Sequence, residues 1–286
     1  MSTTRAIQTR IKSATNIAQI TKAMQMVAAS KMRRAQDQAA SGKPYADKLA
    51  EMLFEIAEHT TADSHPLLQE NTSNKSLFII FSSDRGLTGG LNTNLNKFAI
   101  EQTADHDTTV IAIGKKARDL AVKMEYPLLA EFTGWTDHSR FDQILPIAEL
   151  VMNNYLANNF GSVYLVYMAF HSTLSQKPTI QQLLPLAYHT IDRPSDLLRV
   201  QKEYLFEPSP TEILAQLIPY YIEVELYQTL LESKASEHSA RMVAMKNASD
   251  NAKDVIRELK LMYNKTRQAA VTKELNEITT AMLSLE

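Results

Sequence analysis

The stretch MKNASDNAKDVIRELKLMYNKTRQA, residues 245–269, places apolar or small side chains at alternating intervals of three and four residues. The members of this ladder are Met245, Ala248, Ala252, Val255, Leu259, Met262, Thr266 and Ala269. A spacing of this kind, sustained over several turns, is typical of a left-handed coiled coil. We therefore predict a helix that packs lengthwise against another helix, in preference to an ordinary core helix.

Both ends of the chain lack the residues that break helices. All seven glycines and ten prolines lie between positions 42 and 219. Residues 3–58 and 211–286 are expected to form helices about 80 Å and about 110 Å long. Because both leave the same central region, they should pair antiparallel, with the C-terminal helix extending past its partner by roughly 30 Å.

The N-terminal helix has two apolar stripes. The first consists of Ile7, Ile11, Ala14, Ala18 and Thr21, and the second of Ile17, Ile20, Met24 and Val27. The apolar face shifts along the helix instead of stopping, as expected for a helix wound around a partner.

The middle of the chain alternates between β-prone and helical segments. Strands are predicted at residues 77–81, 109–113, 163–170 and 180–188, and helices at 91–100, 115–124 and 141–159. Buried strands separated by helices favour a mostly parallel sheet. The fold class is therefore an α/β, Rossmann-like domain inserted into a long antiparallel coiled coil. We assign residues 1–65 and 208–286 to the two helical arms and residues 74–207 to the α/β domain.

Charge is concentrated in the two arms. Residues 1–43 hold eight basic residues and one acid, a net +7, and residues 241–273 hold eight basic residues and three acids, a net +5. Such arms favour an acidic partner surface. Nucleic acid is disfavoured because neither arm interleaves aromatic with basic residues and the pI is near 6.4.

Several classes of site find no support in the sequence. The chain has no cysteine, which excludes thiol chemistry and disulfides. The seven histidines show no metal-ligand spacing, and neither Asp84 nor Asp142 has an evident partner. No apolar run is long enough to predict a membrane span, and residues 1–43 lack the pattern of a secretory signal. We predict no catalytic residue, no metal site and no cofactor.

A glycine-rich turn, DRGLTGG at residues 84–90, follows the first predicted strand. It could cradle a phosphate, but it lacks both the Gly-Lys-Ser/Thr ending and the G-x-G-x-x-G spacing of nucleotide sites. We favour a structural turn.

Four segments together resemble the gamma subunit of F-type ATP synthase, the central rotor shaft. They are RIKSATNIAQITKAMQMVAASKMRRA (10–35), SDRGLTGGLN (83–92), ARMVAMKNASDNA (240–252) and LMYNKTRQAAVTKELNEI (261–278). The resemblance covers essentially the whole chain. It implies a noncatalytic subunit, present in one copy, that couples ion-driven rotation of a membrane ring to ATP synthesis or hydrolysis.

The resemblance also implies partners and a location. The partners are the catalytic and noncatalytic subunits of a hexamer, the epsilon subunit and the membrane rotor ring. The location is peripheral, on the cytoplasmic face of the bacterial inner membrane, with no segment inserted into the bilayer. The coupling ion is a proton or a sodium ion.

Fifteen residues are the predicted partner contacts. Six are cations of the N-terminal arm, joined by Met24 at a packing contact. Glu207, in FEPS, matches a segment near the membrane ring, and the remaining residues form a polar cluster and an apolar tip on the C-terminal arm. The full set is Arg10, Lys12, Lys22, Met24, Lys31, Arg33, Arg34, Glu207, Arg267, Gln268, Thr272, Leu275, Ile278, Met282 and Leu285.

Two other functions compete with the rotor. One is a static coiled-coil scaffold. The other is a nucleotide-binding α/β enzyme whose helical arms mediate oligomerisation.

Overall fold

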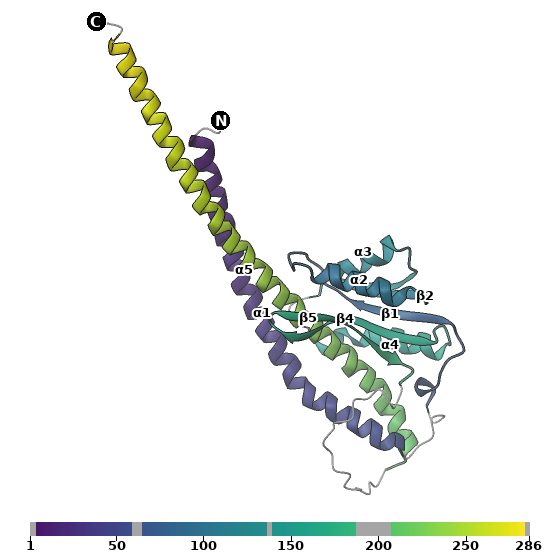
Figure 1. Ribbon diagram of the computed structural model, residues 1–286. Helices are drawn as coiled ribbons and strands as arrows, with labels where there is room; N and C mark the ends of the chain where they lie inside the picture. The colour runs from purple at the N-terminus through teal and green to yellow at the C-terminus, as the bar shows by residue number, and fades with distance from the viewer. Residues whose placement is uncertain (1–3, 59–64, 136–138, 187–206, 284–286) are drawn as a thin grey trace. The chain divides into compact units, whose positions relative to one another are not determined.

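The computed structural model describes residues 4–58, 65–135, 139–186 and 207–283 (Figure 1). Its two longest elements are the helices α1 (Thr4–Glu58) and α5 (Pro210–Leu283). The chain divides into two compact units. We call Met1–Ala29 with Arg241–Glu286 the helical unit, and Ser30–Ala240 the sheet unit.

In the helical unit, α1 and α5 lie side by side and antiparallel (Figure 1). Ile7 and Ala28 of α1 are buried, and Ile11, Ala14, Ala18 and Thr21 between them are half-buried. The Ser249 hydroxyl of α5 donates a hydrogen bond to the Ala18 carbonyl at 3.4 Å. The predicted coiled coil is therefore confirmed, and its seam on α1 is the first of the two predicted stripes.

The register predicted for α5 is partly wrong. Val255 and Met262 are 46% and 50% exposed, whereas Ile256 and Tyr263 are half-buried in their places. The buried or half-buried set is Met245, Ser249, Ala252, Ile256, Leu259, Tyr263 and Thr266, with Ala248 also half-buried. The two registers share every seventh residue and differ at the positions between. The spacing alone could not separate them at residues 255–256 and 262–263, because both neighbours are apolar there. Ala269, the last predicted position of the ladder, is exposed.

The second predicted stripe of α1 does not form part of the seam. Ile17, Ile20 and Val27 are 53%, 59% and 53% exposed, and only Met24 is half-buried. These side chains are apolar but face away from α5.

The sheet unit contains five strands in the order β3-β2-β1-β4-β5. The strands are β1 (Lys75–Phe81), β2 (Asp107–Ile113), β3 (Leu128–Phe132), β4 (Ser162–Ser172) and β5 (Ser175–Leu184). All neighbouring pairs are parallel except β4 with β5, which form an antiparallel hairpin. The mostly parallel sheet is thus confirmed.

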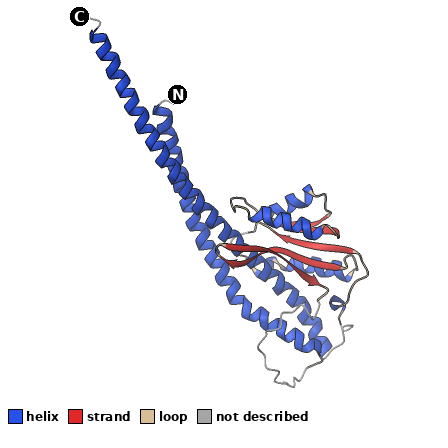
Figure 2. Ribbon diagram, viewed as in Figure 1, coloured by secondary structure: helices blue, strands red, loops and turns tan. Residues whose placement is uncertain are grey.

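Each face of the sheet is covered by helices (Figure 2). Phe78 and Ile80 of β1 pack with α2 (Leu91–Thr103) and α3 (Lys115–Lys123) on one face. Leu77, Ile79 and Phe81 point the other way, as the period of two in a strand requires, and pack with α4 (Leu145–Leu156). The same cluster includes side chains of α1 and α5, so the long helices contribute to the core of this unit. Short 3-10 turns occupy Pro66–Leu68 (η2) and Phe141–Gln143 (η3).

Two strands depart from prediction. β3 was not predicted, because it is a five-residue edge strand with a half-exposed pattern and too short to give a clear period. The last strand is Ser175–Leu184, earlier than the predicted 180–188, and residues 187–188 lie outside the described ranges. The start of this strand was not predicted because it is polar, with Gln176 and Lys177, and contains no apolar run.

Candidate interaction surfaces

The basic face of α1 is the first candidate surface. In the helical unit, the described part of α1 holds four basic residues and no acid. Three of the four, Arg10, Lys12 and Lys22, are predicted partner contacts, and all three are exposed. Met24, also a predicted contact, is half-buried. The other three predicted cations lie in the sheet unit, where Arg33 and Arg34 are exposed and Lys31 is half-buried.

The acids of α5 in the helical unit largely pair within their own helix. Asp250 bonds Lys253 at 2.9 Å, Asp254 lies 3.3 Å from Arg257, and Glu277 lies 3.6 Å from Lys273. The hydrogen bond from Lys253 also lowers the pKa of Asp250. Lys22 of α1 also lowers the pKa of Asp250, and the described part of α1 in this unit keeps a net positive charge that favours an acidic partner surface.

The α5 tip is the second candidate surface. Every side chain from residue 267 to residue 282 is exposed, so this segment has no helical partner among the described residues. It includes Arg267, Gln268 and Thr272, and the apolar Leu275, Ile278 and Met282 at 59%, 59% and 67% exposure. Leu285, also a predicted contact, lies outside the described residues. Figure 1 shows the α5 end extending past the start of α1 within the helical unit.

Glu207 belongs to the sheet unit and is exposed just before α5 begins. Ser209, two residues later, accepts a bond from the Glu212 backbone N–H at 3.3 Å and so caps the helix. The position is accessible, as a contact with another subunit requires.

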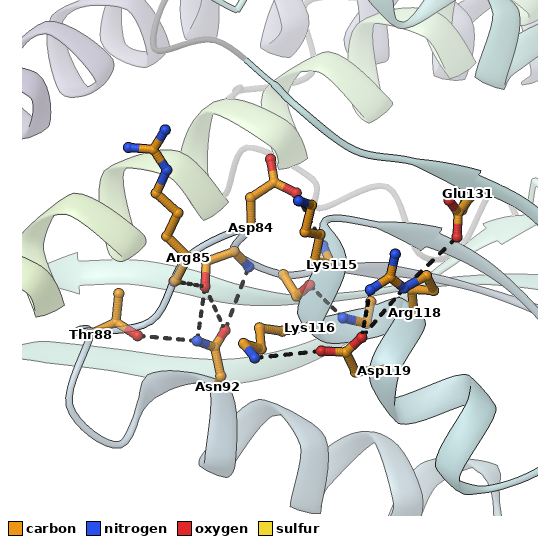
Figure 3. A network of polar contacts seen from close by, with 12 residues as sticks. Asp84, Arg85, Thr88, Asn92, Lys115, Lys116, Arg118, Asp119 and Glu131 are labelled. Atoms are coloured by element: carbon orange, nitrogen blue, oxygen red, sulfur yellow. Dashed lines mark hydrogen bonds and ion pairs between the residues drawn. The ribbon is translucent and has the colours of Figure 1, made fainter.

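The glycine-rich turn is occupied by the protein's own hydrogen bonds (Figure 3). One oxygen of Asp84 accepts the backbone N–H of Lys115 at 3.1 Å, and the other accepts those of Gly134 and Trp135 at 3.0 and 3.2 Å. Asp84 thereby joins the loops that follow β1, β2 and β3. This partner set was missed in the sequence, because it lies 31 to 51 residues away along the chain.

The start of α3 is satisfied in the same way. The Lys116 N–H bonds the Ser83 carbonyl at 3.2 Å, and the Ala117 N–H bonds the Ser82 hydroxyl at 2.7 Å. On the other side of the turn, Asn92 donates to Ser83 and Thr88 at 2.8 and 3.1 Å. A phosphate at a helix N-terminus needs backbone donors that are unoccupied, and the first three of α3 are bonded within the chain. The arrangement fits the predicted structural turn.

Asp142 also has a partner that the sequence analysis missed. Its carboxylate pairs with the Arg140 guanidinium at 2.8 Å, on the surface beside η3. Among the described residues, no group of three or more His, Asp or Glu side chains could hold a metal ion.

A row of polar side chains on α5 inside the sheet unit is a third feature, also missed in the sequence. Glu225, Glu232 and Ser239 recur every seven residues, so they share one face of the helix. The first two are partly buried and Ser239 is fully buried. We call these three residues the polar stripe. The seven-residue spacing is visible in the sequence, but polar residues at such a spacing are equally typical of a solvated helix face.

The polar stripe meets the β4–β5 hairpin. Gln181 of β5 donates to Glu225 at 2.6 Å. Ser239 donates to the carbonyl of Thr173, in the hairpin turn, at 2.7 Å, and receives a longer bond from Gln176 at 3.4 Å.

Burial is the main influence on the two carboxylates of the stripe. It raises the pKa of Glu225, against the lowering effect of the Gln181 hydrogen bond. It likewise raises the pKa of Glu232, where Lys43 of α1 acts in the opposite direction and Glu225 adds to the rise. The two acids of the stripe are therefore held where the charged form is disfavoured.

No helix in the described ranges is both long and apolar enough to cross a bilayer.

The chain matches known proteins along its whole length. A family model described as ATP synthase matches residues 3–285. The ATP synthase gamma chain of Roseiflexus sp. (strain RS-1) is 44% identical, over 100% of this chain and 99% of that protein. The gamma chain of Desulfitobacterium hafniense is 43% identical over 100% of both.

Solved structures agree with these relatives. The central stalk and ring structure of Tetrahymena thermophila mitochondrial ATP synthase contains a chain that is 25% identical, with a TM-score of 0.61, covering 80% of this chain and 99% of that one. A chain of the Euglena gracilis mitochondrial enzyme has a TM-score of 0.69 at 20% identity, covering 99% of this chain and 94% of that one, and supports the fold. Together with the full-length family match, these relatives show that the chain belongs to the ATP synthase gamma chain family.

Proposed function

We propose that this chain is the central-stalk rotor subunit of an F-type ATP synthase, coupling rotation of a membrane ring to ATP synthesis or hydrolysis in a surrounding hexamer. The observation that carries the proposal is the α5 tip, where 16 consecutive exposed positions, 267 to 282, include four large apolar side chains, Val271, Leu275, Ile278 and Met282. Such side chains on a bare helix require a cover from other chains. A sleeve formed by a hexamer would provide it.

The coupling mechanism follows from asymmetry. A single antiparallel helix pair has no threefold symmetry, so three surrounding catalytic subunits would each meet a different face of it. A rod that favours a different conformation in each subunit converts rotation into sequential conformational change. The cations of α1 would face acidic segments of those subunits, and the apolar stripe of Ile17, Ile20 and Val27 would be covered there.

The remaining partner assignments are part of the same proposal. The related structures are a central stalk with its ring from Tetrahymena thermophila and F1 with its ring from Euglena gracilis, which supports the ring and the F1 hexamer as partners. We further propose one copy per complex, contact with an epsilon subunit, a proton or sodium ion as the coupling ion, and a noncatalytic role. The proposed location of the chain is the cytoplasmic face of a bacterial inner membrane. The fifteen contact residues and the division at 1–65, 74–207 and 208–286 remain predictions.

Reconstitution tests the proposal. The complex assembled with this chain should contain one copy with three of each hexamer subunit, and should generate a membrane potential in liposomes when ATP is added. A complex assembled without it should hydrolyse ATP without building a potential. Equal potential with and without the chain would contradict the rotor function and favour a scaffold.

The enzyme alternative has a separate test. Isothermal titration of the isolated chain with ATP should give no stoichiometric binding, because the turn has neither nucleotide-site spacing and the backbone donors at the neighbouring start of α3 are bonded internally. Tight one-to-one binding, abolished by Asp84→Ala, would favour a nucleotide-binding enzyme.

A further inference from the structure

The first part of the polar stripe lies in a mostly apolar contact, whereas Ser236, Glu237 and His238 beside Ser239 are themselves buried polar residues. Within the sheet unit, α5 has no exposed side chain from residue 221 to residue 240, and its buried neighbours include Ile222, Leu226 and Leu230. Polar groups in such a contact lose hydration and add little to stability even when paired. Their presence at three heptad-spaced positions therefore calls for a role other than stability.

An apolar contact is weakly directional. Hydrophobic burial depends on area, so a helix that rolls or slides a little over a sheet loses little of it. A paired polar group behaves differently, because a shift breaks its hydrogen bond and leaves a donor or acceptor unsatisfied away from water. Buried polar pairs fix the register of helices in coiled coils for this reason.

The two ends of the stripe are both held by the β4–β5 hairpin. Glu225 and Ser239 are 14 residues apart, which is about 21 Å along the helix. Gln181 holds the first and the hairpin turn at Thr173 holds the second. Two attachments at that separation resist both rotation about the helix axis and sliding along it, which a single attachment would not.

We propose that the polar stripe keys α5 to the β4–β5 hairpin, so that torque passes between the sheet and the helix without slip. This inference rests on the proposed rotor function, and it makes Glu225, Glu232 and Ser239 positioning residues. At Glu232, midway along the stripe, burial raises the pKa and the positive charge of Lys43 on α1 acts in the opposite direction.

The experiment compares coupling with stability in the assembled complex in liposomes. The test variant is Gln181→Leu with Glu225→Leu, which replaces the pair by apolar groups that can still pack. Two readouts are taken together: the rate of ATP hydrolysis, and the ATP-driven membrane potential reported by an oxonol dye, which responds to either coupling ion. The thermal midpoint of the isolated chain is the third readout.

We expect the double variant to keep its thermal midpoint and its hydrolysis rate, while the potential per ATP hydrolysed falls at least twofold. Gln182→Leu is the matched control, because Gln182 is the exposed neighbour of Gln181 on the opposite face of β5 and should change neither readout. Glu225→Gln should retain coupling, since the amide can still accept from Gln181.

Other outcomes would overturn the inference. Full coupling in the double variant would do so, as would a parallel loss of hydrolysis, potential and thermal midpoint, which would assign the stripe to folding. If the double variant does not assemble, Ser239→Ala tests the other end of the stripe. The potential per ATP hydrolysed is measured again and interpreted in the same way. Absence of any potential with the unmodified chain would instead contradict the proposed function itself.

Discussion

Two stretches of α5 differ in an unexpected way: one buries polar side chains and the other exposes apolar side chains. In the sheet unit, residues 221–240 of α5 have no exposed side chain, although they include the buried Thr229, Glu237 and His238. In the helical unit, residues 267–282 are exposed throughout, although they include Leu275, Ile278 and Met282.

The contrast shows what each stretch is built to contact. Several of the enclosed polar groups have partners within the chain, as in the Lys234–Glu237 pair at 3.3 Å. Apolar groups are exposed where the proposed function places another chain. Helix formation is the same in both stretches, so the difference lies in tertiary contacts and not in local propensity.

The comparison predicts its largest effect for the core of the sheet unit. Phe78 is fully buried, and Phe78→Ala should lower the free energy of unfolding by about 3–5 kcal/mol, through lost transfer energy and a cavity. The loss of unfolding free energy is measured by urea titration, with circular dichroism as the signal. A loss below about 1 kcal/mol would mean that this core is not packed as described.

The seam of the helical unit should give the next largest effect. Ala252 is buried where α5 contacts α1, and Ala252→Leu should overpack the contact at a cost of about 1–3 kcal/mol. Ala270→Leu, at an exposed position of the same helix, is the control and should change stability by less than about 0.5 kcal/mol. The same urea titration compares them, and equal effects would argue against close packing at Ala252.

The polar stripe predicts an unusual pH dependence. Burial raises the folded-state pKa of Glu225 above its usual 4.5, so the folded chain binds more protons than the unfolded chain just above that pH. The contribution of Glu225 to stability is then full below about pH 4.5 and is lost as pH rises through the folded pKa, at up to about 1.4 kcal/mol per pH unit.

Glu225→Gln removes this titration. Across pH 5 to 8, unfolding free energies of the variant minus those of the unmodified chain should increase with pH. Glu212→Gln, at an exposed acid in the first turn of α5, is the control. A difference that stays constant or falls with pH would show that Glu225 is not held in a protonation-favouring environment.

The smallest effect on the isolated chain should come from the tip. Met282→Ser removes an apolar side chain that is 67% exposed and should change the unfolding free energy by no more than about 0.5 kcal/mol. In the assembled complex the same change should weaken retention of the chain, as measured by dissociation on dilution. Strong destabilisation of the isolated chain would mean that the tip is already covered within one chain.

Prediction from sequence succeeded where a period was long and failed where contacts joined distant segments. The two long helices and the mostly parallel sheet followed from composition and spacing. The register of α5 did not, because Ile256 and Val255, like Tyr263 and Met262, are adjacent apolar candidates whose choice depends on the shape of α1. Strand β3 was too short and too exposed to give a periodic signal.

The polar contacts show the same limit. Asp84 had no partner in the sequence analysis, yet it accepts three backbone N–H groups contributed by two other loops. Backbone donors carry no signature in the sequence, so only the topology could bring them together. The exposed cations and the apolar tip were identifiable as candidates because their residue types are unusual for those positions in a single chain.

The central claim is that the chain turns inside its partners. The complex can be fixed to a surface through its hexamer and a bead attached at Leu174→Cys, since Leu174 is 82% exposed and the chain has no other cysteine. The account predicts that ATP drives rotation of the bead in one direction, in steps of about a third of a turn, as three catalytic subunits require. A stationary bead on complexes that hydrolyse ATP at the full rate would contradict it.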